Sequence, residues 1–384
     1  MARLNRNALA NMRGILQSNI DRGRIPGAIA VVALGGHVEM FDALGARDPA
    51  AGAPMQEDAI FRMYSMTKPL VSLAAVMLME QGRLQPVDPV AMYLPEFAGQ
   101  KVAVEEGGEV VRLVPQVREA TVHDLLRHTA GFTYEFLGGS GVQNLYTAAN
   151  ITDRSRTNAQ FSQMMAGLPL AYQPGSCWYY SRATDVLGAV VEVASGQTLG
   201  AFLKQHIFDP LGMQDTAFNV PQKDWSRMVE PFAQDPDSGE PVVMLDYRED
   251  AAYESGGGGL FGTAADYIRF LQLMRNRGTL DGVRIVSRKA VEWMTSDHLG
   301  SIPIVGEMLP AGHGFGLGFA VRTHTGLSPQ PGSPGQYFWS GVGGTSFMVD
   351  PVEDVFAMLL TQAPNQRIHF RNMFRHLVYA ALDF

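Results

Sequence analysis

Several features that would narrow the function are scarce or missing in this sequence. A single cysteine, Cys177, excludes an intrachain disulfide and is typical of a reducing compartment. Charged residues make up only 18% of the 384-residue chain, and the net charge of −8 disfavours nucleic acid or an anionic membrane surface as the main partner. No window approaches 18 uninterrupted apolar residues, so we expect no membrane span.

The N-terminal stretch, residues 1–27, lacks the apolar core and the small-residue cleavage site of an export signal. Its apolar residues recur at helical spacing, which predicts an amphipathic helix. We therefore expect a cytoplasmic protein, although a chain whose export signal had been removed would show the same pattern.

Three functional motifs are also missing. No Gly-x-Ser-x-Gly occurs, which argues against the nucleophile elbow of ordinary α/β-hydrolases. The glycines at 256–259 are not followed by Gly-Lys-Ser/Thr, which favours a flexible loop over a phosphate cradle. His123 and His128 are five apart and have no acidic partner at metal-ligand spacing. We expect neither a metal nor another cofactor.

What is present is a globular chain, 46% hydrophobic, whose two ends are richer in strands than its middle. Gly27–Leu34 and His37–Leu44 are predicted strands, joined by a Gly-Gly turn. Strands return between residues 316 and 361, and a terminal helix is predicted over Gln366–Asp383.

Helical patterns dominate the middle of the chain, with Pro- and Gly-rich, charged stretches around residues 102–117. The order predicts an α+β (mixed α/β) protein with a helical insertion. We assign residues 1–87 and 240–384 to the α/β domain and 88–239 to a mainly helical inserted domain, with the active site between them.

The strongest chemical signal is Ser65-Met-Thr-Lys68, at the start of an apolar helical run that extends to about Gln81. Side chains at i and i+3 are neighbours on a helix, and a helix N-terminus favours a developing oxyanion. A desolvated lysine can lose its proton near neutral pH and accept that of a serine. Ser65 is the only serine three residues before any of the five lysines.

A proton shuttle is expected from a tyrosine near this pair. Tyr179 and Tyr180 are adjacent, and Tyr180 precedes a predicted helix start, which favours it over Tyr179. A neighbouring lysine ammonium would lower the pKa of the phenol and let it act as a base. Packing in the core is the other interpretation of both side chains.

An oxyanion hole needs a strand edge that a substrate carbonyl can approach closely. The segment Trp339–Val342, within a Gly-rich strand end, fits this requirement because glycine permits close approach of backbone. A competing segment, His324–Gly326, lies in a Pro- and Gly-rich loop with no good strand after it.

Taken in order, Ser65-x-x-Lys68, Tyr180-Ser-Arg182 and Trp339-Ser-Gly341 resemble the motifs of the serine β-lactamase and penicillin-binding-protein superfamily. The resemblance covers roughly residues 10–380 and is greatest to the class C-related family VIII carboxylesterases. It implies a β-lactamase-like antiparallel sheet flanked by helices.

The resemblance also implies roles for single residues. Ser65 would form an acyl-enzyme, and Lys68 and Tyr180 would move its proton. The backbone N–H groups of Ser65 and Val342 would form the oxyanion hole. The substrate-binding positions would be Arg182, Trp339 and Gly341. Arg182 stands where the lactamases carry an asparagine, and Trp339 stands where they carry a lysine that helps hold the substrate carboxylate.

Trp339 offers an apolar wall in place of a cation, which favours neutral esters over anionic β-lactams. The expected function is thus a carboxylesterase acting on a small-molecule ester with a short chain or small alcohol. The alternatives are a β-lactamase, a D-amino-acid amidase or peptidase, an acyltransferase, and a non-catalytic binding protein on the same scaffold.

Overall fold

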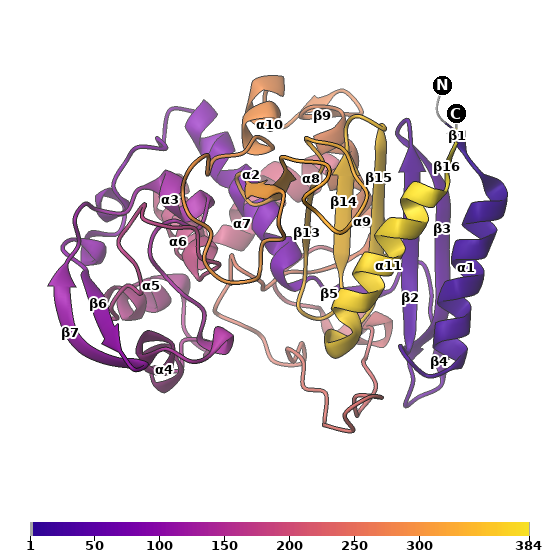
Figure 1. Cartoon of the computed structure of the whole chain (residues 1–384), viewed down its shortest axis with the longest axis horizontal. Coiled ribbons are helices and arrows are strands. Elements are labelled where there is room, and N and C mark those ends of the chain that lie inside the picture. Colours follow the sequence, from indigo (N-terminus) through magenta and orange to yellow (C-terminus); the bar gives the residue numbers. More distant parts are fainter. Residues whose placement is uncertain (1–2, 384) are drawn as a thin grey trace.

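The structure, a computed structural model, describes residues 3–383. Its centre is an eight-stranded antiparallel sheet with the spatial order β11-β12-β13-β14-β15-β2-β3-β4 (Figure 1). The two ends of the chain meet in this sheet, because β2 pairs with β15. The central strands are buried on both faces, as expected for runs of apolar residues that are covered by helices. The predicted fold class is confirmed.

The strands of the main sheet have the following bounds: β2 (Gly27–Leu34), β3 (His37–Asp48), β4 (Ala53–Pro54), β11 (His313–Phe315), β12 (Ala320–Arg322), β13 (Tyr337–Ser340), β14 (Ser346–Asp350) and β15 (Val355–Leu360). The remaining strands form short pairs: β1 (Arg3–Leu4) with β16 (Leu382–Asp383), β5 (Ile60–Arg62) with β8 (Phe261–Thr263), β6 (Lys101–Glu106) with β7 (Glu109–Pro115), and β9 (Thr279–Leu280) with β10 (Val283–Arg284).

Helices cover both faces of the sheet. In the view of Figure 1, α1 (Arg6–Asp21) and α11 (Arg367–Ala380) lie in front and α9 (Ala264–Arg275) lies behind. The N-terminal helix is the amphipathic helix that the sequence predicts: Met12 and Leu16 are buried on one side of it.

Most of the helices between β5 and β8 form a lobe beside the sheet (Figure 1). They are α3 (Val122–Leu126), α4 (Gly141–Ala148), α5 (Asn158–Ala166), α6 (Ala183–Ser195), α7 (Leu199–Leu203) and α8 (Asp209–Leu211). Helix α10 (Arg288–Met294) follows later in the chain.

The lobe also holds the β6–β7 hairpin, which was not predicted from the sequence. Its strands are joined by Gly107-Gly108, just as Gly35-Gly36 joins β2 to β3. The domain boundaries stay a prediction.

Helix α2 (Thr67–Glu80) lies between the sheet and the lobe and packs against α6 and α7 (Figure 1). Every residue from Thr67 to Leu78 is buried, so this helix is part of the core all round rather than along one stripe. A one-turn 3₁₀ helix, Tyr64–Met66, precedes α2 and carries Ser65. The predicted helix start is therefore two residues early, but Ser65 still lies directly at its N-terminal end.

No single helix within residues 3–383 is long and apolar enough to cross a membrane. One pair of helices, Ala183–Ser195 and Leu199–Leu211, is together long and apolar enough to cross a membrane, but the two helices are bent by 74° relative to each other.

Candidate active site

Ser65 and Lys68 meet as their spacing predicts. The Lys68 ammonium nitrogen, Nζ, lies 3.2 Å from the Ser65 hydroxyl oxygen, Oγ. Lys68 is fully buried by the packing of α2. Burial lowers the pKa of Lys68 to about 7; the negative charge of Asp185 opposes this shift and the positive charge of Arg182 adds to it. Near neutral pH, a large fraction of the amine is therefore unprotonated and available as a base.

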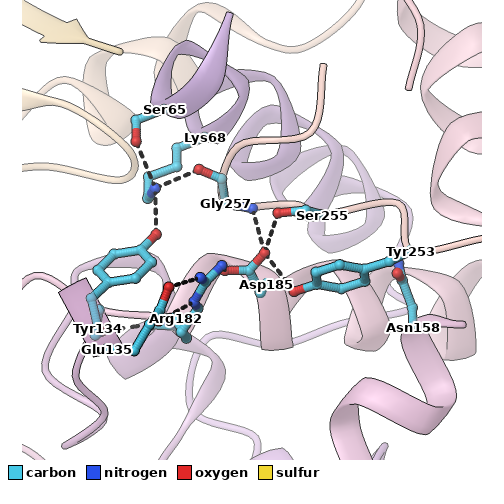
Figure 2. Close-up of polar contacts among 12 residues, drawn as sticks. Ser65, Lys68, Tyr134, Glu135, Asn158, Arg182, Asp185, Tyr253, Ser255 and Gly257 are labelled. Atoms are coloured by element: carbon cyan, nitrogen blue, oxygen red, sulfur yellow. Dashed lines mark hydrogen bonds and ion pairs between the residues drawn. The ribbon is translucent and has the colours of Figure 1, made fainter. Parts of the chain in front are cut away.

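Two further acceptors surround Lys68, and the sequence analysis missed both (Figure 2). Nζ donates to the Tyr134 hydroxyl at 2.8 Å and to the backbone carbonyl of Gly257 at 2.6 Å. Tyr134 directly precedes the 3₁₀ helix Glu135–Leu137, and no motif marks it in the sequence. Gly257 belongs to the glycine run interpreted as a flexible loop; its carbonyl is instead held directly against the candidate base.

Tyr180, rather than Tyr179, lies against Ser65. The Tyr180 hydroxyl donates to Ser65 Oγ at 2.7 Å and accepts from the Trp339 indole N–H at 3.3 Å. The Tyr179 hydroxyl accepts from Gln143 instead. Trp339 is thus more than the apolar wall that the sequence analysis expected, because its indole fixes the candidate proton shuttle.

The predicted direction of the Tyr180 pKa shift is wrong. Burial raises the pKa of this phenol, and the hydrogen bonds with Ser65 and Trp339 oppose the shift without reversing it. Tyr180 is therefore a phenol near neutral pH, suited to donating a proton, and the candidate base is Lys68. The lysine nitrogen lies over the Tyr180 ring, 4.6 Å from its centre, so the tyrosine would favour the ammonium form once Lys68 has accepted a proton.

The predicted oxyanion segment, Trp339–Val342, spans the end of β13 and the turn after it, and it packs closely on the turn that carries Ser65. The Gly341 N–H donates to the Thr345 carbonyl at 2.8 Å. A Cβ atom on Gly341 would lie 2.6 Å from the Met63 carbonyl and 2.4 Å from Thr345 Oγ1, so only glycine fits. Val342 follows and lines the same cavity as Ser65. The competing segment, His324–Gly326, contributes no residue to that cavity.

Arg182 lines the cavity, but carboxylates of the lobe hold its guanidinium group. It forms an ion pair with both oxygens of Glu135 and approaches Asp185 Oδ2 at 3.5 Å (Figure 2). It also lies over the Tyr134 ring, 4.7 Å from its centre. These contacts give Arg182 a structural role beside Lys68; its binding of substrate stays a prediction.

The cavity over Ser65 has a volume of about 530 Å³, within the range of small-molecule sites. Its walls are largely apolar and include the following residues: Phe136, Leu137, Phe218, Met308, Val342 and Ile368. Ser65, Tyr134 and Tyr180, which lie together around Lys68, also line the cavity. Across residues 3–383, no three His, Cys, Asp or Glu side chains converge as they would around a metal ion.

Two arginines of the first turns of α11 also line this cavity. Arg371 donates to Ser340 Oγ at 2.5 Å, and Arg367 donates to the Pro364 carbonyl at 2.5 Å. Within the described chain, neither guanidinium has a carboxylate within 4.0 Å. Arg371 is half-buried, and this burial lowers the pKa of its guanidinium group.

The chain matches the family described as "Beta-lactamase" over residues 11–380. Esterase EstB of Burkholderia gladioli is 33% identical over 377 residues, which covers 92% of this chain and 90% of that protein. The lovastatin esterase of Penicillium rubens is 32% identical over 296 residues, covering 74% and 72% respectively. The solved structure of EstCE1, described as a hydrolase with promiscuous acyltransferase activity, has a TM-score of 0.81 at 28% identity and covers 97% of this chain and 99% of its own. The protein therefore belongs to the beta-lactamase family.

Proposed function

We propose that this protein is a serine carboxylesterase in which Ser65 forms an acyl-enzyme. The observation that carries the proposal is that Ser65 Oγ lies within hydrogen-bond reach of both a buried amine, Lys68, and a buried phenol, Tyr180. That arrangement provides a nucleophile, a base and a proton donor at one atom. The names of two relatives, an esterase and a lovastatin esterase, support ester hydrolysis.

In the acylation half-reaction, neutral Lys68 takes the Ser65 proton while Oγ attacks the carbonyl carbon. The backbone N–H groups of Ser65 and Val342 stabilise the oxyanion, a contribution of about 3 kcal/mol per donor. As the C–O bond to the alcohol breaks, Tyr180 gives its phenolic proton to the leaving oxygen. Lys68 is then an ammonium and Tyr180 a phenolate that accepts the Trp339 N–H.

Deacylation reverses these transfers. The Tyr180 phenolate takes a proton from water, and the resulting hydroxide attacks the acyl carbon. When the ester bond to Oγ breaks, Lys68 returns its proton to Ser65. Each group ends in its starting protonation state, and one water molecule has been consumed.

For the substrate, we propose an ester with a short acyl chain or a small alcohol, accommodated by the apolar walls of the cavity. The unpaired arginines on α11 favour a second candidate, an ester that also carries a carboxylate. Poorly solvated cations without a counter-ion are costly, and a substrate carboxylate would relieve that cost.

Turnover of p-nitrophenyl butyrate should be abolished in Ser65→Ala, because no other group replaces the nucleophile. The matched control is Ser72→Ala, which changes a buried serine of the same helix whose hydroxyl has no hydrogen-bond partner among the described residues. Parallel assays with a chromogenic cephalosporin should show little hydrolysis by the wild type. Dominant Ser65-dependent lactam hydrolysis would instead identify a β-lactamase, and undiminished turnover in Ser65→Ala would place the nucleophile elsewhere.

Tyr180→Phe should lower kcat by about 10²- to 10⁴-fold, the usual contribution of a general acid or base. Tyr179→Phe is the neighbouring control and should change kcat little, because its hydroxyl contacts Gln143 rather than Ser65. Steady-state kinetics with the butyrate ester measure both. The reverse pattern would show that the adjacent tyrosine is the shuttle.

The pH dependence of kcat/KM should show an acid limb with an apparent pKa of about 7, the value to which burial lowers the pKa of Lys68. Only the neutral amine can accept the serine proton, so activity rises with pH through this value and falls about tenfold per unit below it. A limb near the ordinary lysine pKa, or no limb between pH 5 and 9, would exclude Lys68 as the base.

Two chromogenic esters with the same glutaryl backbone, p-nitrophenyl hemiglutarate and its methyl ester, test the arginines of α11. Arg371→Gln and Arg367→Gln should each lower the ratio of kcat/KM for the acid to that for the methyl ester, since a charge-assisted contact is worth about 1.5–3 kcal/mol. The control, Arg284→Gln, changes an exposed arginine on β10. An unchanged ratio would leave the neutral ester as the one candidate.

A further inference from the structure

Asp185 is a buried carboxylate behind the site, and the reaction as written does not use it. It lies near the start of α6 and is 1% exposed. Its Oδ1 oxygen accepts three hydrogen bonds: from the Tyr253 hydroxyl at 2.8 Å, the Ser255 hydroxyl at 2.5 Å and the Gly257 N–H at 3.0 Å (Figure 2). Such a number of donors at one oxygen fixes both the carboxylate and the segment that donates to it.

The same residue, Gly257, therefore links Asp185 to the candidate base. Its N–H donates to Asp185 and its carbonyl accepts from Lys68 Nζ at 2.6 Å, so one residue spans the distance between the carboxylate and the amine (Figure 2). A Cβ atom at position 257 would lie 2.4 Å from Asp185 Oδ2, which explains why the segment carries glycine here.

The carbonyl constrains the orientation of the neutral lysine. An ammonium group has three N–H donors, which match the three acceptors Ser65 Oγ, Tyr134 Oη and the Gly257 carbonyl. The neutral amine has two N–H donors and one lone pair. A carbonyl cannot donate a hydrogen bond, so it must always receive an N–H, whereas either hydroxyl can donate to the lone pair. The lone pair is therefore confined to the side of the two hydroxyls, one of which is the nucleophile.

We propose that Asp185 is a positioning residue that holds the Gly257 carbonyl against Lys68 and thereby keeps the lysine lone pair directed towards Ser65 and Tyr134. This inference rests on the proposed function, in which Lys68 accepts the serine proton. Asp185 acts through Gly257 and does not touch the substrate. The other oxygen, Oδ2, lies 3.5 Å from the Arg182 guanidinium, so the buried Asp185 side chain also has a cationic partner.

Asp185→Ala removes the acceptor and should lower the rate at which Ser65 reacts, at plateau pH, by about 10- to 100-fold with little change in KM for the butyrate ester. Asp185→Asn keeps an oxygen that can accept the Gly257 N–H and should restore most of that rate. The acid limb of the pH–rate profile of Asp185→Asn should also move to lower pH. The charge of Asp185 raises the pKa of Lys68, so its removal lowers that pKa. A merely structural role would lower the melting temperature without a selective loss of the Ser65 reaction rate in Asp185→Ala and its recovery in Asp185→Asn.

One control separates this effect from a general loss of packing. Asp266→Asn changes a buried carboxylate on α9, which holds Thr216, and should lower the melting temperature without moving the acid limb. Circular dichroism and thermal melts establish that each variant is folded.

The readout is the rate of Ser65 phosphonylation by a fluorophosphonate probe between pH 5 and 9, followed by intact-protein mass spectrometry alongside ester turnover. A wild-type protein that neither reacts nor turns over ester would overturn the proposed function and this inference with it. A reactive wild type with folded Asp185→Ala at an unchanged rate would overturn the inference alone. If Asp185→Ala does not fold, Asp185→Leu, which fills the space without offering an acceptor to the Gly257 N–H, replaces it: a lowered plateau rate supports the inference, and an unchanged rate contradicts it.

Discussion

The site depends on the burial of one amine away from any carboxylate. Lys68 is fully buried and, within residues 3–383, has only neutral oxygens as hydrogen-bond partners. A direct carboxylate partner would hold the lysine as an ammonium at neutral pH, whereas desolvation alone favours the free amine. The negative charge of Asp185 opposes this shift without reversing it, and the positive charge of Arg182 adds to the shift. A pKa of about 7 is the balance of these effects.

The fold provides this balance by bringing three separate segments around the start of α2. The helix is buried on all sides, so its first turn has no access to water except through the cavity. The lobe contributes Tyr134 and Tyr180, while the loop before β8 contributes the Gly257 carbonyl. Strand β13 contributes Trp339 and the close-packed glycine that follows. The reacting atoms therefore lie where the sheet and the lobe meet.

The sequence predicted the parts of the site that depend on residue type and local spacing. Ser65 and Lys68 are three apart at a helix start, and Tyr180 was preferred over Tyr179 because a helix start follows it. The structure places both Lys68 and Tyr180 against Ser65 Oγ, and their catalytic roles stay predictions. The strands at both ends of the chain and the terminal helix followed from hydrophobic periodicity and turn residues. These features are encoded within a few neighbouring residues, which is why a single sequence is enough to detect them.

What the sequence did not show depends on contacts between distant segments. Gly257 acts through its backbone carbonyl, which every residue type possesses, so no motif marks it. Tyr134 is 66 residues from Lys68 and resembles any core tyrosine until the fold brings the two together. The Tyr180 pKa was predicted in the wrong direction because the proximity of a cation was considered without the burial, which is the larger effect. The β6–β7 hairpin was missed although its Gly-Gly turn was visible.

The central claim is that Ser65 carries the acyl group during turnover. The most direct measurement is rapid acid quenching of the wild-type protein with excess p-nitrophenyl butyrate, followed by intact-protein mass spectrometry and peptide mapping. If Ser65 is the nucleophile, a single butyryl group accumulates before the steady state and maps to Ser65. Ester turnover without any covalent adduct, or with the butyryl group on another residue, would contradict the mechanism.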